Sequence, residues 1–224
     1  AVAAGPIAGF FDLAVRPVDV KGMCTSGPED PFDGYWRELC ALAGVAYDDV
    51  PWAITAVDGA RAKASYNGGL VVARAGRGIL QTWADIFIAS VRRGLYPHAV
   101  AGGFRTSVGT VPPRAGRLWG SNQAALSVAA CRAGARVKIL DPAYNYPLHL
   151  HAVLRDRAIR DLNQLVHVHY HWLFEPDAIA GAVLPGPDST VEPERLAWLR
   201  ARTPLRAPQG IMASLGNLFR RSSV

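Results

Sequence analysis

The sequence predicts an α/β fold in which a mixed sheet is flanked by helices. Short apolar runs, typical of buried strands, alternate with longer segments in which apolar residues recur at helical spacing. Half of the 224 residues are hydrophobic and 19% are charged, a composition typical of a folded chain with a sizeable core. We expect one domain over residues 1–184, followed by a Pro- and Arg-rich helical tail over residues 185–224.

Turn and cap signals divide the first part of the chain into elements. The pair Asp58-Gly59 is typical of a hairpin turn, and Asp33 can cap a helix that ends at Gly44. The apolar run inside YNGGLVVAR indicates a buried strand. The expected order is a strand at 13–18, a turn-rich connector at 24–31, a helix at 33–44, a hairpin at 52–65 and a strand at 66–74.

Two more helices are expected in the rest of the chain. Apolar residues recur at helical spacing from Gly78 to Arg93, and Gly94 supplies the end. Ser121 can cap a helix of small residues that ends at Gly134. The remaining expectations are a loop with little regular structure at 95–120, a strand at 136–140, a histidine-rich strand at 165–172 and a helix at 195–202.

Charge and cysteine content argue against several classes of partner. The formal charge of +6 comes mainly from Arg residues spread through the chain, with no basic stripe of the kind that binds nucleic acid. The three cysteines form no CxxC pair and are expected to be reduced thiols, which favours the cytoplasm. The sequence contains no run of about 18 apolar residues, so it predicts no membrane span. The bias toward Arg, Ala, Gly and Val fits a GC-rich bacterial gene.

The C-terminal segment IMASLGNLFRR (211–221) has the pattern of an amphipathic helix. Its apolar residues share one helical face beside Arg220 and Arg221. One interpretation is a helix that touches anionic lipid, which would hold the protein at the inner face of the membrane as a peripheral protein. The other is a frayed or core-docked terminal helix.

The stretch VHVHYHW (166–172) places three of the six histidines at every second position. Because side chains alternate across a strand, His167, His169 and His171 would share one face, with neighbours roughly 6–7 Å apart. Two histidines so spaced can reach one divalent metal ion, as in a metal site or a small metalloprotein or hydrolase built on this face. The alternative is that the rings pack and hydrogen-bond in a polar groove.

Two further motifs combine glycine with side-chain amides. In YNGG (66–69), Gly68 and Gly69 leave the backbone bare beside Asn67, whose amide can both donate to and accept from a sugar hydroxyl. In WGSNQ (119–123), two amides stand at the start of a helix, where unpaired N–H groups can orient a polar ligand. The alternatives are a bulge or tight turn for YNGG and an ordinary helix start for WGSNQ.

The order of these motifs resembles the later part of nucleotide-sugar glycosyltransferases with the A-type fold, of the glycogenin and lipopolysaccharide-galactosyltransferase type. Those enzymes carry an FN[SA]G strand, a helix that begins DQ-x-x-L, a Leu-Pro...Asn segment and a late HY- or HF-x-G strand. The segment AVRPV (14–18) is similar to the segment directly after the acidic metal-binding motif in such enzymes. The other matching stretches are YNGG (66–69), NQAAL (122–126), LDPAYNY (140–146) and HYHW (169–172), so the resemblance spans residues 14–175.

The resemblance implies transfer of a sugar from a nucleotide-sugar donor to a hydroxyl of a carbohydrate or lipid-linked acceptor. A divalent metal ion, Mn²⁺ or Mg²⁺, would hold the diphosphate of the donor. The residues that would carry these roles are Asn67, Gly68 and Gly69 in the donor-sugar pocket, Asn122 and Gln123 at the reacting carbon as the catalytic pair, His169 as the metal ligand, and Trp119 and His171 beside the substrate.

Three departures from the family pattern bear on activity. Asn122 stands where the family has Asp, and Trp172 stands where it has Gly. No Asp-x-Asp motif occurs in the sequence, and the half of the fold that grips the nucleotide would precede residue 14. We therefore expect the chain to be the C-terminal portion of the fold and incomplete as an enzyme. The alternative is a non-catalytic carbohydrate-binding or regulatory remnant of that fold.

Overall fold

A computed structural model describes residues 10–98, 104–106, 109–111, 116–147, 154, 164–169, 194 and 197. It confirms the α/β class, because long helices accompany a mixed sheet. The helices are α1 (Asp33–Ala43), α2 (Ile79–Arg92) and α4 (Ser121–Arg132), with 3-10 turns at Tyr47–Asp49 and Ala75–Arg77. The strands are β1 (Leu13–Val15), β2 (Trp52–Ile54), β3 (Arg61–Lys63), β4 (Val72–Ala73), β5 (Phe104–Thr106), β6 (Gly109–Val111), β7 (Val137–Ile139), β8 (Tyr146–Pro147) and β9 (Val168–His169).

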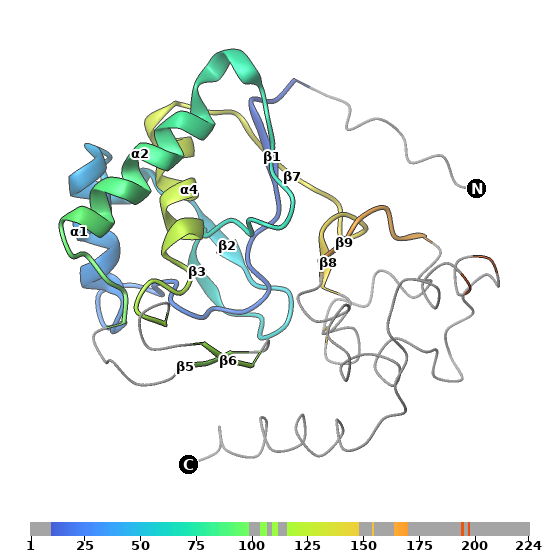
Figure 1. The fold of residues 1–224 in the computed structure, drawn as a ribbon, viewed down its shortest axis with the longest axis horizontal. Coiled ribbons are helices and arrows are strands. Elements are labelled where there is room, and N and C mark those ends of the chain that lie inside the picture. Colours follow the sequence, from blue (N-terminus) through green and yellow to red (C-terminus); the bar gives the residue numbers. More distant parts are fainter. Residues whose placement is uncertain are drawn as a thin grey trace.

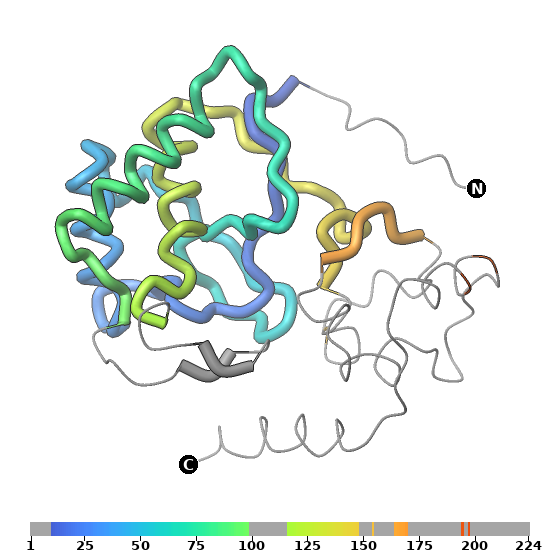
Figure 2. Tube along the Cα trace, viewed as in Figure 1, coloured from blue at the N-terminus to red at the C-terminus, as the bar shows by residue number. Residues whose placement is uncertain are grey.

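The central sheet has the strand order β4-β1-β7. β1 pairs antiparallel with β4, with Leu13 opposite Ala73, and parallel with β7, with Leu13 opposite Val137. Figure 2 shows these three segments side by side although they come from distant parts of the chain. All three residues of β1 are fully buried, as expected for a central strand with an apolar sequence on both faces.

The three helices lie together on one side of β1 and β7 (Figure 1). α4 packs against both α1 and α2, and its small side chains allow close approach. One of its faces brings Leu126 against Leu13 of the sheet, while another brings Val128 into a cluster with Trp36 of α1 and Ile86 of α2. α4 therefore joins the sheet to the helical layer, and its first residues are held at the edge of the core.

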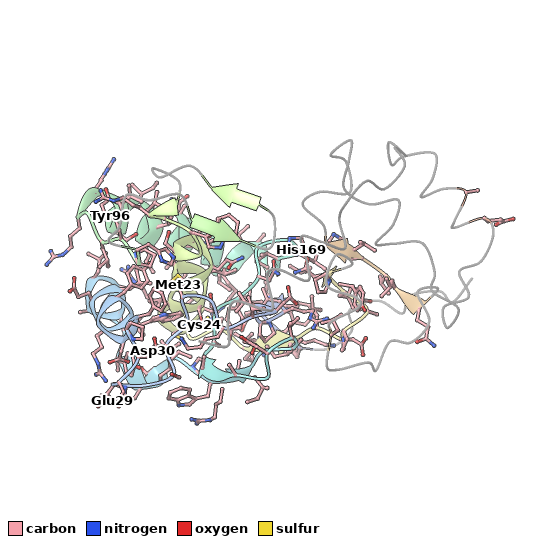
Figure 3. The ribbon with its side chains drawn as sticks, turned by 90° about the horizontal axis from the view of Figure 1, so that it is seen from below. Met23, Cys24, Glu29, Asp30, Tyr96 and His169 are labelled. Carbon is pink, nitrogen blue, oxygen red and sulfur yellow. The ribbon has the colours of Figure 1, made fainter. Side chains whose placement is uncertain are left out.

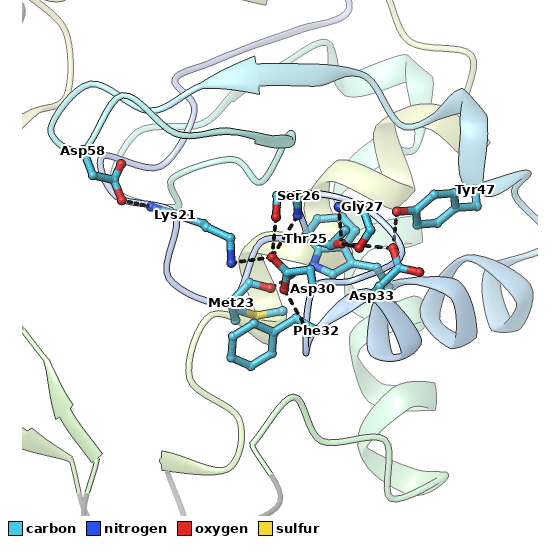
Figure 4. A network of polar contacts seen from close by, with 11 residues as sticks. Lys21, Met23, Thr25, Ser26, Gly27, Asp30, Phe32, Asp33, Tyr47 and Asp58 are labelled. Carbon is cyan, nitrogen blue, oxygen red and sulfur yellow. Dashed lines mark hydrogen bonds and ion pairs between the residues drawn. The ribbon is translucent and has the colours of Figure 1, made fainter. Parts of the chain in front are cut away.

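The turn-rich connector between β1 and α1 is fixed by polar contacts (Figure 4). Asp30 accepts hydrogen bonds from the backbone N–H and the hydroxyl of Ser26, at 3.0 and 2.7 Å, and pairs with Lys21 at 2.7 Å. The indole N–H of Trp36 donates to the carbonyl of Met23 at 2.9 Å. These bonds order the connector without strand or helix.

Two predicted helix caps are wrong. Asp33 is the first residue of α1, and its carboxylate accepts from the hydroxyl of Thr25 at 3.0 Å. Ser121 is likewise the first residue of α4, and its hydroxyl donates to the carbonyl of Leu118 at 2.6 Å. The position before α4 is Gly120, whose φ of 81° is left-handed. In both cases the side chain forms a hydrogen bond with another residue in place of a bond to a free N–H group of the helix.

The strand predictions are confirmed in part. The hairpin at 52–65 forms as β2 and β3, with Trp52 opposite Lys63. Of the strand expected at 66–74, only β4 forms. The prediction of a loop at 95–120 is wrong for β5 and β6, which pair as antiparallel strands. The boundary expected at residue 184 and the segment 211–221 lie outside the described residues. Within the described ranges, every helix is too short or too polar to cross a bilayer.

Candidate functional site

The segment that follows β1 runs antiparallel to the YNGG segment. The Val18 N–H donates to the carbonyl of Ser65 at 2.9 Å, and the Asn67 N–H donates to the carbonyl of Arg16 at 2.8 Å. Ligands of open α/β sheets collect beyond the carboxyl ends of strands. Asn67 is therefore held by its backbone where a functional site is expected.

The side chain of Asn67 is the centre of the candidate site. It is buried, with 5% of its surface exposed. Its Oδ1 accepts from the Gly69 N–H at 2.9 Å, and its Nδ2 donates to Oδ2 of Asp19 at 3.2 Å. The same Nδ2 lies 3.2 Å from Nδ1 of His169, the last residue of β9. Figure 3 labels His169 and shows where its side chain lies in the fold. One amide thus links residues that are 48 and 102 positions away in the sequence.

Gly69 occupies a position that no larger residue could take without displacing its neighbours. A Cβ atom there would lie 2.5 Å from Oδ1 of Asn145 and 2.6 Å from Cδ2 of His169. Because glycine has no Cβ, the exposed backbone of Gly69 can lie directly against both side chains. This close approach explains the glycine in the YNGG motif.

Asn145 contributes a second buried amide. It is 1% exposed, and among the described residues it is the only non-glycine with a positive φ, 50°. Among the residues that the structure describes, neither its Nδ2 nor its Oδ1 has a hydrogen-bond partner. A buried polar group without a hydrogen bond destabilises the fold by about 1–3 kcal/mol. Stability therefore does not explain why an asparagine is present at this position. The parallel pairing of β8 with β9, with Pro147 opposite His169, holds Asn145 beside the imidazole.

Asp19 contributes a carboxylate to the site. Burial raises the pKa of Asp19 from 3.8 to about 6, and the nearby charge of Arg16 and the hydrogen bond from Asn67 oppose this rise. Nη1 of Arg16 donates to the carbonyl of Pro142 at 2.9 Å, which ties the segment that carries Asn145 to the end of β1. At neutral pH Asp19 is mostly ionised and can only accept hydrogen bonds.

The start of α4 lies beside the YNGG segment. The carbonyl of Gln123 accepts from the Tyr66 N–H at 3.5 Å, and Nδ2 of Asn122 lies 4.0 Å from the point that a Cβ of Gly68 would occupy. The Asn122 side chain is exposed, while its carbonyl accepts from the indole N–H of Trp83 at 2.6 Å. The start of α4 and the YNGG segment therefore lie next to each other, while a shared functional site stays a prediction.

The other predicted site residues are not brought to Asn67 by any contact that the structure describes. Trp119 is half-buried, and its carbonyl lies 3.2 Å from Nε2 of His98. His171 lies outside the described residues. His167 is described, and its Nδ1 is a buried atom with no hydrogen-bond partner in the described part of the chain. Of the three alternating histidines, His169 alone is shown in contact with Asn67.

The expected divalent metal stays a prediction. No three of the His, Cys, Asp and Glu side chains in the described part of the chain lie close enough together to hold an ion. Asp19 and His169 both face Nδ2 of Asn67, which is a hydrogen-bond donor and no metal ligand. Mn²⁺ and Mg²⁺ prefer several oxygen ligands.

Three members of the site were missed by sequence reasoning, namely Arg16, Asp19 and Asn145. Arg16 and Asp19 lie directly after an apolar strand, where polar side chains reach the carboxyl edge of a sheet. Asn145 lies inside a stretch that matches the family pattern, and asparagine is among the few residues that tolerate a left-handed backbone. Both signals were present in the sequence.

Comparison of the chain with protein-family models, with curated proteins and with solved structures finds no match. The assignment of a function therefore depends on the residues themselves.

Proposed function

We propose that the site around Asn67 binds the sugar group of a nucleotide-sugar donor, and that the chain is the sugar-binding portion of a glycosyltransferase with the A-type fold. The observation that carries the proposal is the meeting of Asn67, Asn145 and His169. These residues lie in three of the stretches that resemble the family, YNGG, LDPAYNY and HYHW. Contact between stretches that lie far apart in the sequence indicates that they form part of one functional site or one core.

The chemistry of the site suits a sugar. A hydroxyl group donates and accepts at once, and the carboxamides of Asn67 and Asn145 can do both. The carboxylate of Asp19 only accepts, so it would fix the direction in which a hydroxyl points. Hydrogen bonds are strong in a buried site, and a buried polar group left without one is costly. The site therefore favours a ligand that forms a hydrogen bond with each of these groups.

The reaction and the fold form one proposal. A mixed sheet whose antiparallel strand β4 directly follows YNGG supports the A-type fold. Asn122 and Gln123 would lie near the reacting carbon, because α4 begins beside Gly68. The acceptor would be a carbohydrate or a lipid-linked hydroxyl in the cytoplasm, reached with or without membrane contact through residues 211–221. The divalent metal stays a prediction, and the proposed roles of these residues do not depend on it.

A second candidate function is carbohydrate binding without transfer. Asn122 favours it, because a neutral amide stabilises the positive charge that develops at a reacting sugar carbon less than a carboxylate does. Both candidates share the same sugar site and differ only in turnover.

Calorimetric titration with UDP-glucose, UDP-galactose and GDP-mannose tests the proposal. We expect binding of at least one donor, and binding at least tenfold weaker in N145G, which keeps the left-handed backbone and removes the amide. The control is Q81A, which removes an exposed amide from α2 and should bind like wild type. Nucleotide release by the wild type identifies a transferase, whereas binding without release identifies the second candidate. Failure to bind any of the three donors contradicts both.

A further inference from the structure

We infer that Asn67 holds His169 as the neutral imidazole protonated at Nε2, and that this ring therefore serves the site by hydrogen bonding and does not coordinate a divalent metal. The inference goes beyond the proposed function and depends only on the contacts of the Asn67 amide. It holds whether or not the site binds a sugar.

The orientation of the Asn67 amide is fixed by two partners of known polarity. The Gly69 N–H can only donate, so the atom 2.9 Å from it must be the oxygen Oδ1. The carboxylate of Asp19 only accepts, so the atom 3.2 Å from it must be the nitrogen Nδ2. A flipped amide would set donor against donor at Gly69 and acceptor against acceptor at Asp19. Both partners require the same orientation.

This orientation decides the proton position on His169. Nδ2 of Asn67 has two hydrogens, and with one directed to Asp19 the other faces Nδ1 of His169 at 3.2 Å. A hydrogen bond at this contact needs a lone pair on Nδ1, which places the ring proton on Nε2. Either the Nδ1-protonated tautomer or the doubly protonated ring would set two N–H groups against each other.

The assigned tautomer is the opposite of the one that a metal-bound histidine needs. A histidine that binds a metal through one nitrogen donates the N–H of the other nitrogen to a carboxylate or a carbonyl, which raises its basicity. At His169 the group opposite Nδ1 is a donor, and the lone pair at Nδ1 is engaged by Asn67. Metal binding through Nε2 would require the proton to move to Nδ1, with loss of the hydrogen bond to Asn67.

Long-range ¹H–¹⁵N correlation spectra of the labelled chain report the tautomer directly. We expect His169, assigned by the signals lost in H169Q, to show a pyrrole-type Nε2 and a pyridine-type Nδ1. In a titration with Mn²⁺ alone, monitored by line broadening, the signals of wild type and H169Q should broaden equally. A protonated Nδ1 in the wild type, or micromolar Mn²⁺ binding that H169Q abolishes, would overturn the inference.

A polarity exchange supplies the matched variant. In D19N/N67D the amide and the carboxylate trade places, so the pair keeps one hydrogen bond while the introduced carboxylate accepts from the Gly69 N–H and attracts a proton to Nδ1 of His169. The tautomer should switch, and Zn²⁺ affinity should rise at least tenfold over wild type, with the rise lost when H169Q is added. An unchanged tautomer in a folded double variant would count against the inference. Loss of sugar binding alone would bear only on the proposed function, because the spectra do not depend on a sugar.

Discussion

Asp19 gives the site a pH-dependent effect on stability. The pKa of its carboxyl is about 6 in the folded protein because burial disfavours the charge, whereas its ordinary value is 3.8. Between these values the folded chain binds the proton more tightly than the unfolded chain. The stability that this group contributes is complete below pH 3.8 and is lost as the pH rises through 6.

We expect D19N to be more stable than wild type at neutral pH by up to about 3 kcal/mol, the free energy that corresponds to the rise of this pKa. The gain should shrink toward zero in acid, where the wild-type carboxyl is already protonated in the folded state. Urea denaturation between pH 4 and pH 7 measures the difference. D85N, on the exposed face of α2, is the control, and a D19N chain that is less stable at neutral pH would refute the expectation.

At the level of single residues, the sequence predicted part of the candidate site. Asn67 and His169 were expected in one place because of their motifs, and the structure brings them into contact. Their role in sugar binding stays a prediction. The motif could single out Asn145 but not rank it, because its importance comes from burial and from the lack of a partner among the described residues, and both depend on β8 pairing with β9.

Among the elements, helices were predictable and short strands were not. The bounds expected for α1, α2 and α4 agree with the structure within one or two residues, because helical periodicity and a terminal glycine are local signals. β5 and β6 were missed, and β4 is much shorter than its apolar run suggests. A strand of two or three residues exists only through its partner, which no local pattern specifies.

The central position of α4 makes its alanines intolerant of added volume. Ala129 is fully buried among α1 and α2 residues such as Trp36 and Ile86. We expect A129L to lower the free energy of unfolding by about 1–3 kcal/mol, because a close-packed interior has no room for three more carbons. A84L, the same change on the exposed face of α2, should alter it by less than about 0.5 kcal/mol. Equal stabilities in denaturant melts would show that α4 is loosely packed.

For the molecule as a whole, Asp12 joins three chain segments at the amino end of β1. Its carboxylate accepts from Nε and Nη2 of Arg136 at 2.9 and 3.0 Å and forms ion pairs with Arg74 and Arg77 at 3.6 Å. The hydrogen bonds from Arg136 hold the pKa of Asp12 well below its usual range. This buried carboxylate ties the end of β4 and the start of β7 to the first strand.

D12N should therefore melt at a lower temperature than wild type at neutral pH, because an amide cannot balance three guanidinium groups. The folded pKa of Asp12 is lowered, so its contribution to stability is present above pH 3.8 and is lost as the pH falls further. Thermal melts should accordingly show the two chains converging in strong acid. E38Q, an exposed change on α1, controls for the loss of one negative charge, and it should melt like wild type.

The parallel pairing of β1 with β7 also sets the order of events during synthesis. Asp12, at the start of β1, is separated from its partner Arg136, at the start of β7, by 124 residues. A ribosome must therefore add all of the residues between β1 and β7 before β1 can pair with β7. Topologies in which strands far apart in the sequence pair with each other fold slowly. Until β7 is made, the apolar segment Leu13–Val15 of the nascent chain stays exposed and prone to aggregate. Its apolar residues are where a chaperone would first be needed.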